Sequence, residues 1–201
     1  ERIGFTRISG AIMRCAAPGQ EEVEADLHGS GQKTHVRETA WGDMPGVACL
    51  MGQGVDSLMV DYLRGLVSPR HVAPVRCVSN FTTTFYDVKA HGGRMLTLVG
   101  ATAHRVLGFA TLTPGPAPAR DHTAVIDVVT HDHYVPQTPD LFDRILAEAK
   151  AMEVEVVQAW VATTDTRKAD WLKNAGLQPL VTVPNALRVG DRSISAVLFQ
   201  K

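Results

Sequence analysis

The second half of the chain alternates between two hydrophobic periodicities. Apolar, β-rich runs at 106–112, 123–130 and 154–162 each have the length of one buried strand. Residues 139–152 and 166–174 instead carry apolar positions at the spacing of an amphipathic helix. The order is therefore strand, strand, helix, strand, helix. Its centre is a β–α–β crossover, the connection that joins parallel strands.

The first half predicts a strand, helices and a stretch that fits two patterns. A short alternating run at 34–40 predicts a strand. A helical apolar face runs from Val47 to Leu66, and because glycines interrupt it we expect two helices. Residues 76–88 hold three consecutive threonines among aromatic residues, which favours extended structure, although a helix beginning at Asn80 also fits.

Two predicted hairpins complete the pattern, one at 94–113 and one at 180–199. The sequence therefore predicts an α/β fold of mixed α+β type, with one central mixed β-sheet flanked by helices on both faces. We expect residues 34–201 to form this main domain. Residues 1–33 stand apart as an N-terminal strand and arm, because 18–33 is polar, acidic and rich in Gly and Gln, as linkers are.

Composition narrows the function classes. Of the 201 residues 45% are hydrophobic and 20% charged, and a net charge of −1 gives no field that would attract nucleic acid or an anionic membrane. No apolar run is long enough to span a bilayer, and no leader-like segment opens the chain. The widely spaced Cys15, Cys49 and Cys77 favour a reducing compartment, so we expect an intracellular protein, cytoplasmic or nuclear. Glu1 in place of Met suggests a piece of a longer chain, whose other domains would be its partners.

Several segments, taken in order, are similar to one enzyme family. Val106-Leu-Gly-Phe-Ala resembles the third strand of the GNAT superfamily of N-acetyltransferases, where a glycine and an aromatic residue commonly occur. Asn174-Ala-Gly-Leu resembles the end of the family's fourth helix, and residues 34–201 follow the family's order of elements. The resemblance implies acetyl-CoA as co-substrate and direct acyl transfer to a protein or peptide amine, a lysine or an N-terminus. It also implies that the backbone of Val128 and Val129 contacts the coenzyme and the reaction's oxyanion.

The loop that binds the coenzyme in that family differs here. Family members have a glycine-rich run between the fourth strand and the third helix, whose successive N–H groups hold the pyrophosphate. By position the loop is 133–138, which has no glycine and loses one donor at Pro136. His133 stands where the family has a basic residue, and Thr138 is the predicted cap of the following helix. We assign coenzyme contacts to this loop and to one later aromatic residue, namely His133, Tyr134, Gln137, Thr138 and Trp171.

Asp127 is the first candidate for the base that would free an acceptor amine. It is a lone carboxylate among apolar residues of the strand at 123–130, and burial there would raise its pKa toward the useful range. The opposite reading, in which it faces a loop, a backbone donor or solvent, fits the sequence equally well. His131 lies two residues on and shares its face if the strand continues, so the two would form a base and its orienter.

Two other chemistries receive less support. His131 and His133 have the spacing of two metal ligands on one face, but no cysteine lies near them, and we expect no metal. No proton donor for a departing thiolate is evident, because Leu172 stands where many family members have a tyrosine. The neighbouring Trp171 cannot supply a proton at neutral pH, and packing in a core or groove is its simpler role.

The sequence leaves two functions open. The first is an acyl-CoA-dependent N-acyltransferase, which requires two neighbouring strands after Pro118 to diverge and admit a pantetheine chain. The second is a catalytically inactive GNAT-like domain that serves recognition or scaffolding in a larger protein. The glycine-free loop and the absent tyrosine favour the second, but a divergent coenzyme loop can still offer backbone donors, so the transferase is our first hypothesis.

Overall fold

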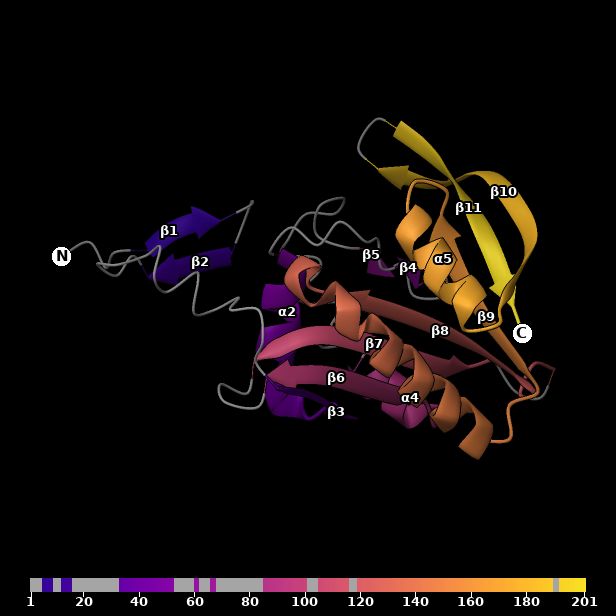
Figure 1. The fold of residues 1–201 in the computed structure, drawn as a ribbon, viewed down its shortest axis with the longest axis horizontal. Helices are drawn as coiled ribbons and strands as arrows, with labels where there is room; N and C mark the ends of the chain where they lie inside the picture. Colours follow the sequence, from indigo (N-terminus) through magenta and orange to yellow (C-terminus); the bar gives the residue numbers. More distant parts are fainter. Residues whose placement is uncertain are drawn as a thin grey trace.

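Seven strands form one mixed β-sheet, in the order β10-β11-β9-β8-β7-β6-β3 (Figure 1). The strands are β3 (Thr34–Glu38), β6 (Arg94–Gly100), β7 (Val106–Pro114), β8 (Thr123–Thr130), β9 (Val156–Ala162), β10 (Gln178–Val189) and β11 (Arg192–Gln200). Every neighbouring pair is antiparallel except β8 and β9, which are parallel. The predicted mixed sheet is confirmed, as are both hairpins, β6–β7 and β10–β11. The computed structural model describes residues 5–8, 12–15, 33–52, 60–61, 66–67, 85–100, 105–115, 119–189 and 192–201.

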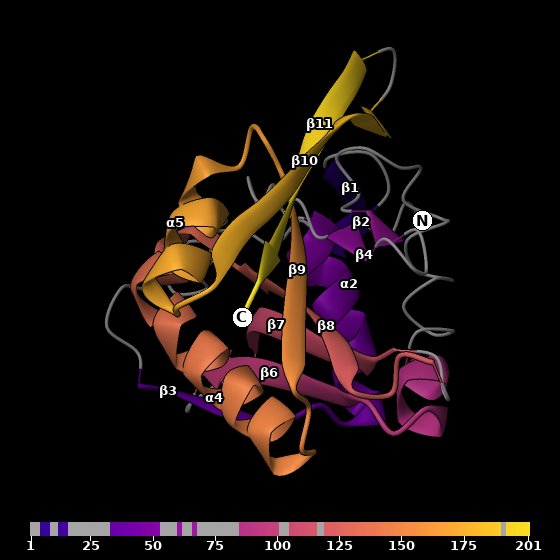
Figure 2. The same ribbon diagram turned by 90° about the vertical axis from the view of Figure 1, so that its right-hand side faces the viewer.

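Helices cover both faces of the sheet, as the sequence predicted. On one face lie α4 (Thr138–Ala151) and α5 (Thr166–Asn174) (Figure 2). On the other lie α2 (Met44–Gly52), which follows the 3₁₀ turn η1 (Trp41–Asp43), and a helical segment at 85–90. The sheet therefore has a separate hydrophobic core on each face, one beneath α4 and one beneath α2.

The side chains of β8 alternate between these two cores. Ile126 and Val128 belong to the core beneath α4. Val129 belongs to the core beneath α2. Because successive side chains of a strand point to opposite faces, Asp127 shares the α2 face with Val129. This placement decides from which side Asp127 can be approached.

Two glycines lie in the segments that resemble the GNAT family, and the structure favours glycine at both positions. A Cβ on Gly108 of β7 would lie 2.7 Å from Leu141 Cδ1 of α4 and 3.2 Å from the carbonyl oxygen of Val129. Glycine at this position therefore lets α4 approach the sheet closely. At Gly176 φ is +89°, the left-handed conformation that ends α5 where the sequence predicted.

In the first half the structure settles one open alternative and contradicts one expectation. Of the two patterns that fit residues 76–88, the described part is helical at 85–90, and Val88 is fully buried in the core beneath α2. The helix expected up to Leu66 is replaced in its described part by β4 (Val60–Asp61) and β5 (Leu66–Val67), which pair antiparallel. The β-branched valines suit this ladder better than a helix. The remainder of that predicted helix pair, after Gly52, lies outside the described residues.

The edge strand expected near the N-terminus is not part of the main sheet. β1 (Phe5–Ile8) and β2 (Ile12–Cys15) pair with each other in a sheet of their own. The two strands thus pair along their facing edges, apart from the central sheet. The linker expected at 18–33 lies almost wholly outside the described residues, and the domain boundary after residue 33 remains a prediction. Within the described part of the chain, no helix has the length and hydropathy that crossing a bilayer requires.

Candidate functional site

The parallel ladder between β8 and β9 ends early. Only the first three residues of β8 pair with β9, the last of them Val125 with Gln158. Beyond this point β8 pairs with β7 alone and β9 with β11 alone, in two strands that are described over their whole length. The strands begin together and diverge toward their carboxyl ends (Figure 1). We call the unpaired region between residues 126–130 of β8 and 159–162 of β9 the split.

The backbone N–H of Val128 in β8 points into the split. His131 N donates to Leu107 O of β7 at 2.8 Å. In an antiparallel pair every second residue bonds to the same neighbour, so the odd-numbered residues of β8 direct their N–H groups toward β7. Val129 therefore directs its N–H toward β7, whereas Val128 directs its N–H toward β9. The Val128 N–H donates to Asp127 Oδ1 at 2.8 Å. Of the two backbone groups assigned to the coenzyme, one thus faces the split and is bonded to the neighbouring carboxylate.

A buried ion pair occupies the same place. Lys168 of α5 donates from Nζ to Asp127 Oδ1 at 2.6 Å, and the two side chains are 2% and 3% exposed. Asp127 lies on the α2 face of the sheet, but α5 covers the α4 face. The Lys168 side chain therefore passes from one face toward the other through the split. Asp127 is not a carboxylate among apolar groups alone, because an ammonium and a backbone N–H bind the same oxygen.

Sequence reasoning missed Lys168, although the signal was present. Lys168 lies four residues before Leu172, so the two share one face of α5. Leu172 is 1% exposed and belongs to the core beneath α4, which makes that face the inner one. A lysine on the inner face of a short amphipathic helix has to find a buried acceptor, and Asp127 was the buried carboxylate already under consideration.

The predicted coenzyme loop is coiled into a 3₁₀ helix, η2 (Asp132–Gln137), which runs directly into α4. His131 caps this helix: its Nδ1 accepts from His133 N at 3.2 Å, and its carbonyl oxygen accepts from Tyr134 N at 2.8 Å. Because Nδ1 accepts, the neutral imidazole carries its proton on Nε2. Two N–H groups of the loop are thus bonded within the helix, and Pro136 has none, so the loop does not present the run of N–H groups that cradles a phosphate.

The side chains of η2 divide between core and surface. Tyr134 is 2% exposed and packs in the core beneath α4, with its ring 6.3 Å from that of His131. His133 is exposed, and its ring centroid lies 5.2 Å from that of His131. Pro136 is exposed as well. Of the two aromatic side chains assigned to the loop, only His133 therefore faces solvent.

The start of α4 differs from the prediction by one residue. Gln137, not Thr138, is the N-cap, and the predicted capping hydroxyl of Thr138 instead donates to Thr130 Oγ1 at 3.0 Å in a buried contact. This bond ties the helix to the end of β8, because η2 already supplies the turn that a cap would close. Gln137 Oε1 is buried without a hydrogen-bond partner.

Two residues of α5 border the site on its outer side. Trp171 is partly buried and its ring lies 6.4 Å from that of Phe142, so it packs between α5 and α4. Arg167 is half exposed, and its Nη1 lies 3.6 Å from Asp132 Oδ1 of η2. Arg167 therefore places a permanent positive charge beside the loop where the sequence expected a phosphate to bind.

Known proteins match this chain in structure rather than in sequence. No protein-family model matches the sequence, and no curated protein matches it. The structure is similar to an N-acetyltransferase from Staphylococcus aureus Mu50, with a TM-score of 0.68 and 13% identity, over 84% of this chain and 98% of that one. It is also similar to a GNAT superfamily phosphinothricin acetyltransferase from Sinorhizobium meliloti in complex with acetyl-CoA, with a TM-score of 0.65 and 10% identity, over 84% and 87% of the two chains. The chain has the GNAT fold.

A third similar structure is a putative acetyltransferase from Salmonella typhimurium with its cofactor acetyl-CoA, at a TM-score of 0.62 and 13% identity, over 84% of this chain and 92% of that one. The resemblance that the sequence showed is thereby confirmed at the level of the fold. In this chain the GNAT fold includes a split whose occupant is the chain's own Lys168.

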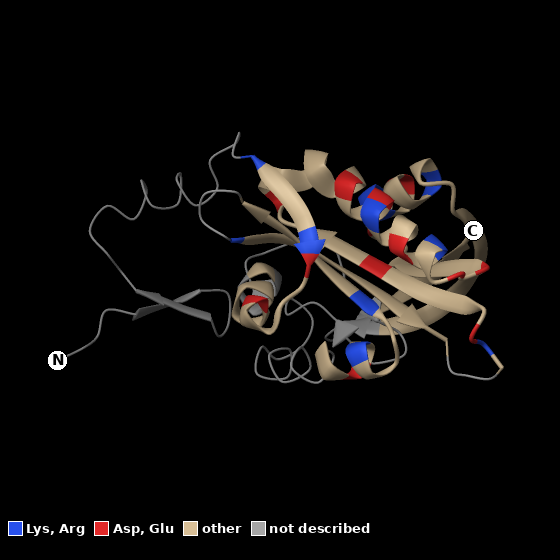
Figure 3. Cartoon of the chain, turned by 90° about the horizontal axis from the view of Figure 1, so that it is seen from below, with Lys and Arg blue, Asp and Glu red and all other residues tan. Residues whose placement is uncertain are grey.

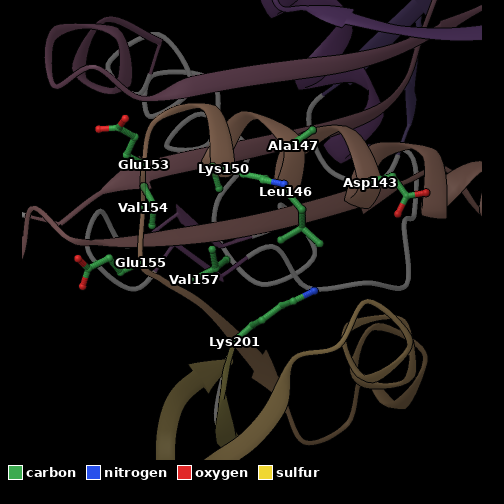
Figure 4. Close-up of a pocket in the computed structure, with 10 residues that line it drawn as sticks. Asp143, Leu146, Ala147, Lys150, Glu153, Val154, Glu155, Val157 and Lys201 are labelled. Atoms are coloured by element: carbon green, nitrogen blue, oxygen red, sulfur yellow. The ribbon is translucent and has the colours of Figure 1, made fainter.

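Two surface features lie apart from the split. A cavity of about 630 Å³ is lined by the second half of α4, the start of β9 and Lys201 (Figure 4). Leu146 and Val157 form its floor among charged side chains, and Asp127 is not part of its lining. Both α4 and α5 carry acidic as well as basic residues (Figure 3). This face of the described structure is therefore mixed in charge.

Proposed function

We propose that this chain is an acyl-CoA-dependent N-acyltransferase, with acetyl-CoA as co-substrate and a protein or peptide amine as acceptor. The observation that carries the proposal is the Asp127–Lys168 contact: the split of a GNAT fold holds a buried carboxylate with a primary amine already bonded to it at 2.6 Å. Amide formation requires a base that lies beside the attacking amine and takes its proton, and Asp127 lies in this position relative to the Lys168 amine. The acetyltransferase names of similar structures support the same reaction class.

Asp127 is the proposed base. An acceptor amine that replaces Lys168 would approach from the α2 face, where the Asp127 side chain lies, and would give its proton to the carboxylate. Val128 would then offer its N–H to the developing oxyanion, once Asp127 Oδ1 has turned to the acceptor. His131 holds η2 in place through Nδ1 and backs the same edge of the sheet, so we propose it as the residue that positions this end of β8.

The acyl arm of acetyl-CoA fits the described residues better than its phosphates do. The unpaired edges of β8 and β9 suit a narrow acyl arm, which would supply the activated acyl carbon. The phosphates would not meet a cradle of backbone N–H groups, because η2 bonds them internally. Side chains would hold the phosphates instead, with the Arg167 guanidinium as the cationic group next to the loop and the exposed His133 beside it.

Ligand-induced stabilisation tests this proposal. A ligand that binds the folded chain alone at 100 times its Kd raises the free energy of unfolding by about 2.7 kcal/mol. We expect acetyl-CoA to produce such a shift in urea unfolding, and we expect thiol release when a lysine-bearing peptide is added. Asp127→Asn should lower thiol release about a hundredfold or more, whereas Asp121→Asn, an exposed change in the turn before β8, should leave it unchanged.

The opposite result has a clear meaning. If millimolar acetyl-CoA leaves the unfolding curve of the wild-type chain in place, the transferase proposal fails. A GNAT-like domain without catalysis, which recognises a partner within a larger protein, would then be the better account of the structure.

A further inference from the structure

Lys168 differs from the other described lysines in its surroundings. It alone among them is buried, at 2% exposure, while Lys33, Lys89, Lys150, Lys173 and Lys201 are exposed. Its amine is held in the split by one carboxylate oxygen, at 2.6 Å. Bulk water is excluded from it, and it lies between the diverging edges of β8 and β9. An electrophile bound in the split would therefore meet this amine first.

We propose that Lys168 is acylated by an acyl thioester bound in the split, so that the chain modifies its own site. This inference rests on the proposed function. In the reaction the ammonium passes one proton to Asp127, and the neutral Nζ attacks the thioester carbonyl carbon. The C–N bond forms, the C–S bond breaks, and the sulfur leaves with the second proton from Nζ. The products are an N-acyl-lysine, a free thiol and a protonated Asp127.

The charge balance of this step suits a buried site. The reactant pair is an ammonium and a carboxylate, and the product pair is an amide and a carboxylic acid, so no net charge is buried before or after the step. The amide also keeps one N–H for hydrogen bonding, and the protonated Asp127 keeps acceptor capacity for the Val128 N–H. Acylation thus removes both buried charges and keeps the hydrogen bond between Asp127 and the Val128 N–H.

The modification would regulate the proposed transferase. Once acylated, Lys168 fills the split with an uncharged, longer side chain, and Asp127 no longer holds an amine. The modified chain should bind acyl thioesters weakly, and an added amine acceptor should slow the modification, because both amines compete for the same acyl group and the same base.

The test follows the covalent product rather than turnover. The full chain is incubated with acetyl-CoA, its mass is measured, and the modified residue is located by fragmentation. We expect one acetyl group, on Lys168. Lys173→Arg is the control, because Lys173 lies on the same helix but is 52% exposed, and this variant should still gain the acetyl group. Lys168→Arg, which retains the positive charge, should not gain it. Asp127→Asn should slow it about a hundredfold. The acetyl ester of N-hydroxysuccinimide, which reacts from solution, should modify Lys173 well before Lys168.

Each outcome decides the inference. If acetyl-CoA stabilises the chain and acetylates an added amine while Lys168 stays unmodified, the inference is overturned and the proposed function stands. If acetyl-CoA neither stabilises nor modifies the chain, both fail. Equal acetylation of Lys173 and Lys168, or an unchanged rate in Asp127→Asn, would identify solution chemistry and overturn the inference. If Lys168→Arg does not fold, the site mapping in the wild-type chain and in Lys173→Arg decides.

Discussion

Two ion pairs in this chain include buried carboxylates, and the two pairs have different consequences. Asp127 and Lys168 are both almost fully enclosed, and a buried ion pair stabilises a fold little compared with an apolar pair of the same size. The consequence of Asp127–Lys168 is therefore chemical: it fixes an amine and a carboxylate in the split. Asp43 and Arg37 form the second pair, with Arg37 a third exposed, and that contact serves the fold.

The Asp43 contact gives a prediction on pH. Burial raises the pKa of the Asp43 carboxyl, but hydrogen bonds from Arg37 and from the Ala40 N–H outweigh burial and hold the pKa below its usual range. A carboxyl with a lowered pKa in the folded state stabilises the fold above its unfolded pKa, near 3.9, and loses that contribution as the pH falls through the folded value. Asp43→Asn should therefore lower the free energy of unfolding by about 1–2 kcal/mol at pH 7, after allowance for the exposure of Arg37.

Urea unfolding at several pH values measures this effect. The difference between the wild type and Asp43→Asn should shrink as the pH is lowered from about 6 to about 3. Asp170→Asn is the control, since Asp170 is exposed and pairs only across one turn of α5 with Lys173, and it should change stability by less than about 0.5 kcal/mol. A difference for Asp43→Asn that stays constant over this range would contradict the assignment.

Burial of individual residues was only partly predictable from the sequence. The period of α5 would have placed Lys168 beside Leu172 on the inner face, and the strand pattern did place Asp127 among apolar neighbours. That the two meet depends on the crossing of α5 over the split, which no local pattern encodes. The sequence predicts Tyr134 as a residue of the coenzyme loop, and its burial follows from the coiling of η2, which turns the ring into the core.

At the scale of elements, β7 and α4 approach each other at Gly108. A Cβ there would meet Leu141 Cδ1 at 2.7 Å and Leu98 Cβ at 3.2 Å, contacts that a packed core relieves by a new rotamer of Leu141 or by a shift of α4. Gly108→Ala should therefore lower the free energy of unfolding by about 1–3 kcal/mol. Gly42→Ala is the matched control, because nothing lies within 4 Å of a Cβ at that position.

Denaturant unfolding of both glycine variants checks the contact. We expect the midpoint to fall for Gly108→Ala and to stay near the wild-type value for Gly42→Ala. Equal midpoints for the two variants would mean that α4 adjusts freely, and the close packing would then not be what fixes the distance between α4 and the sheet.

The least predictable element is η2. Between β8 and α4 the resemblance to the GNAT family implied a coenzyme loop at 133–138. The structure coils the same residues into a 3₁₀ helix that His131 caps from its side chain and its carbonyl. Short 3₁₀ segments are set by such local hydrogen bonds and by the helix that follows, and not by hydrophobic period. The consequence for the site is large, since the coiling uses N–H groups that an open loop would present.

At the scale of the whole molecule, most of the fold could be predicted from the order of the elements along the chain. The crossover from 123–130 through α4 to 154–162 fixed two parallel strands, and the two hairpins fixed the antiparallel remainder. The early end of the β8–β9 ladder could not be read in the same way. Apolar strands of this composition pair as readily along their full length as along three residues, and the divergence depends on what the two faces pack against.

The ion pair between Asp127 of β8 and Lys168 of α5 connects the two faces of the sheet, and its contribution to stability is the last prediction. Lys168→Met should lower the free energy of unfolding by about 3–5 kcal/mol, because it leaves the Asp127 carboxylate buried without its ammonium. Asp127→Asn should destabilise for the complementary reason. The double variant Asp127→Asn/Lys168→Met should be more stable than the sum of the two losses predicts, by about 1 kcal/mol or more, since neither charge remains to be buried. Urea unfolding of the four chains closes this cycle. Additive losses would mean that the two side chains do not interact across the sheet, and then neither the amine bound to Asp127 nor the acylation of Lys168 would have a structural basis.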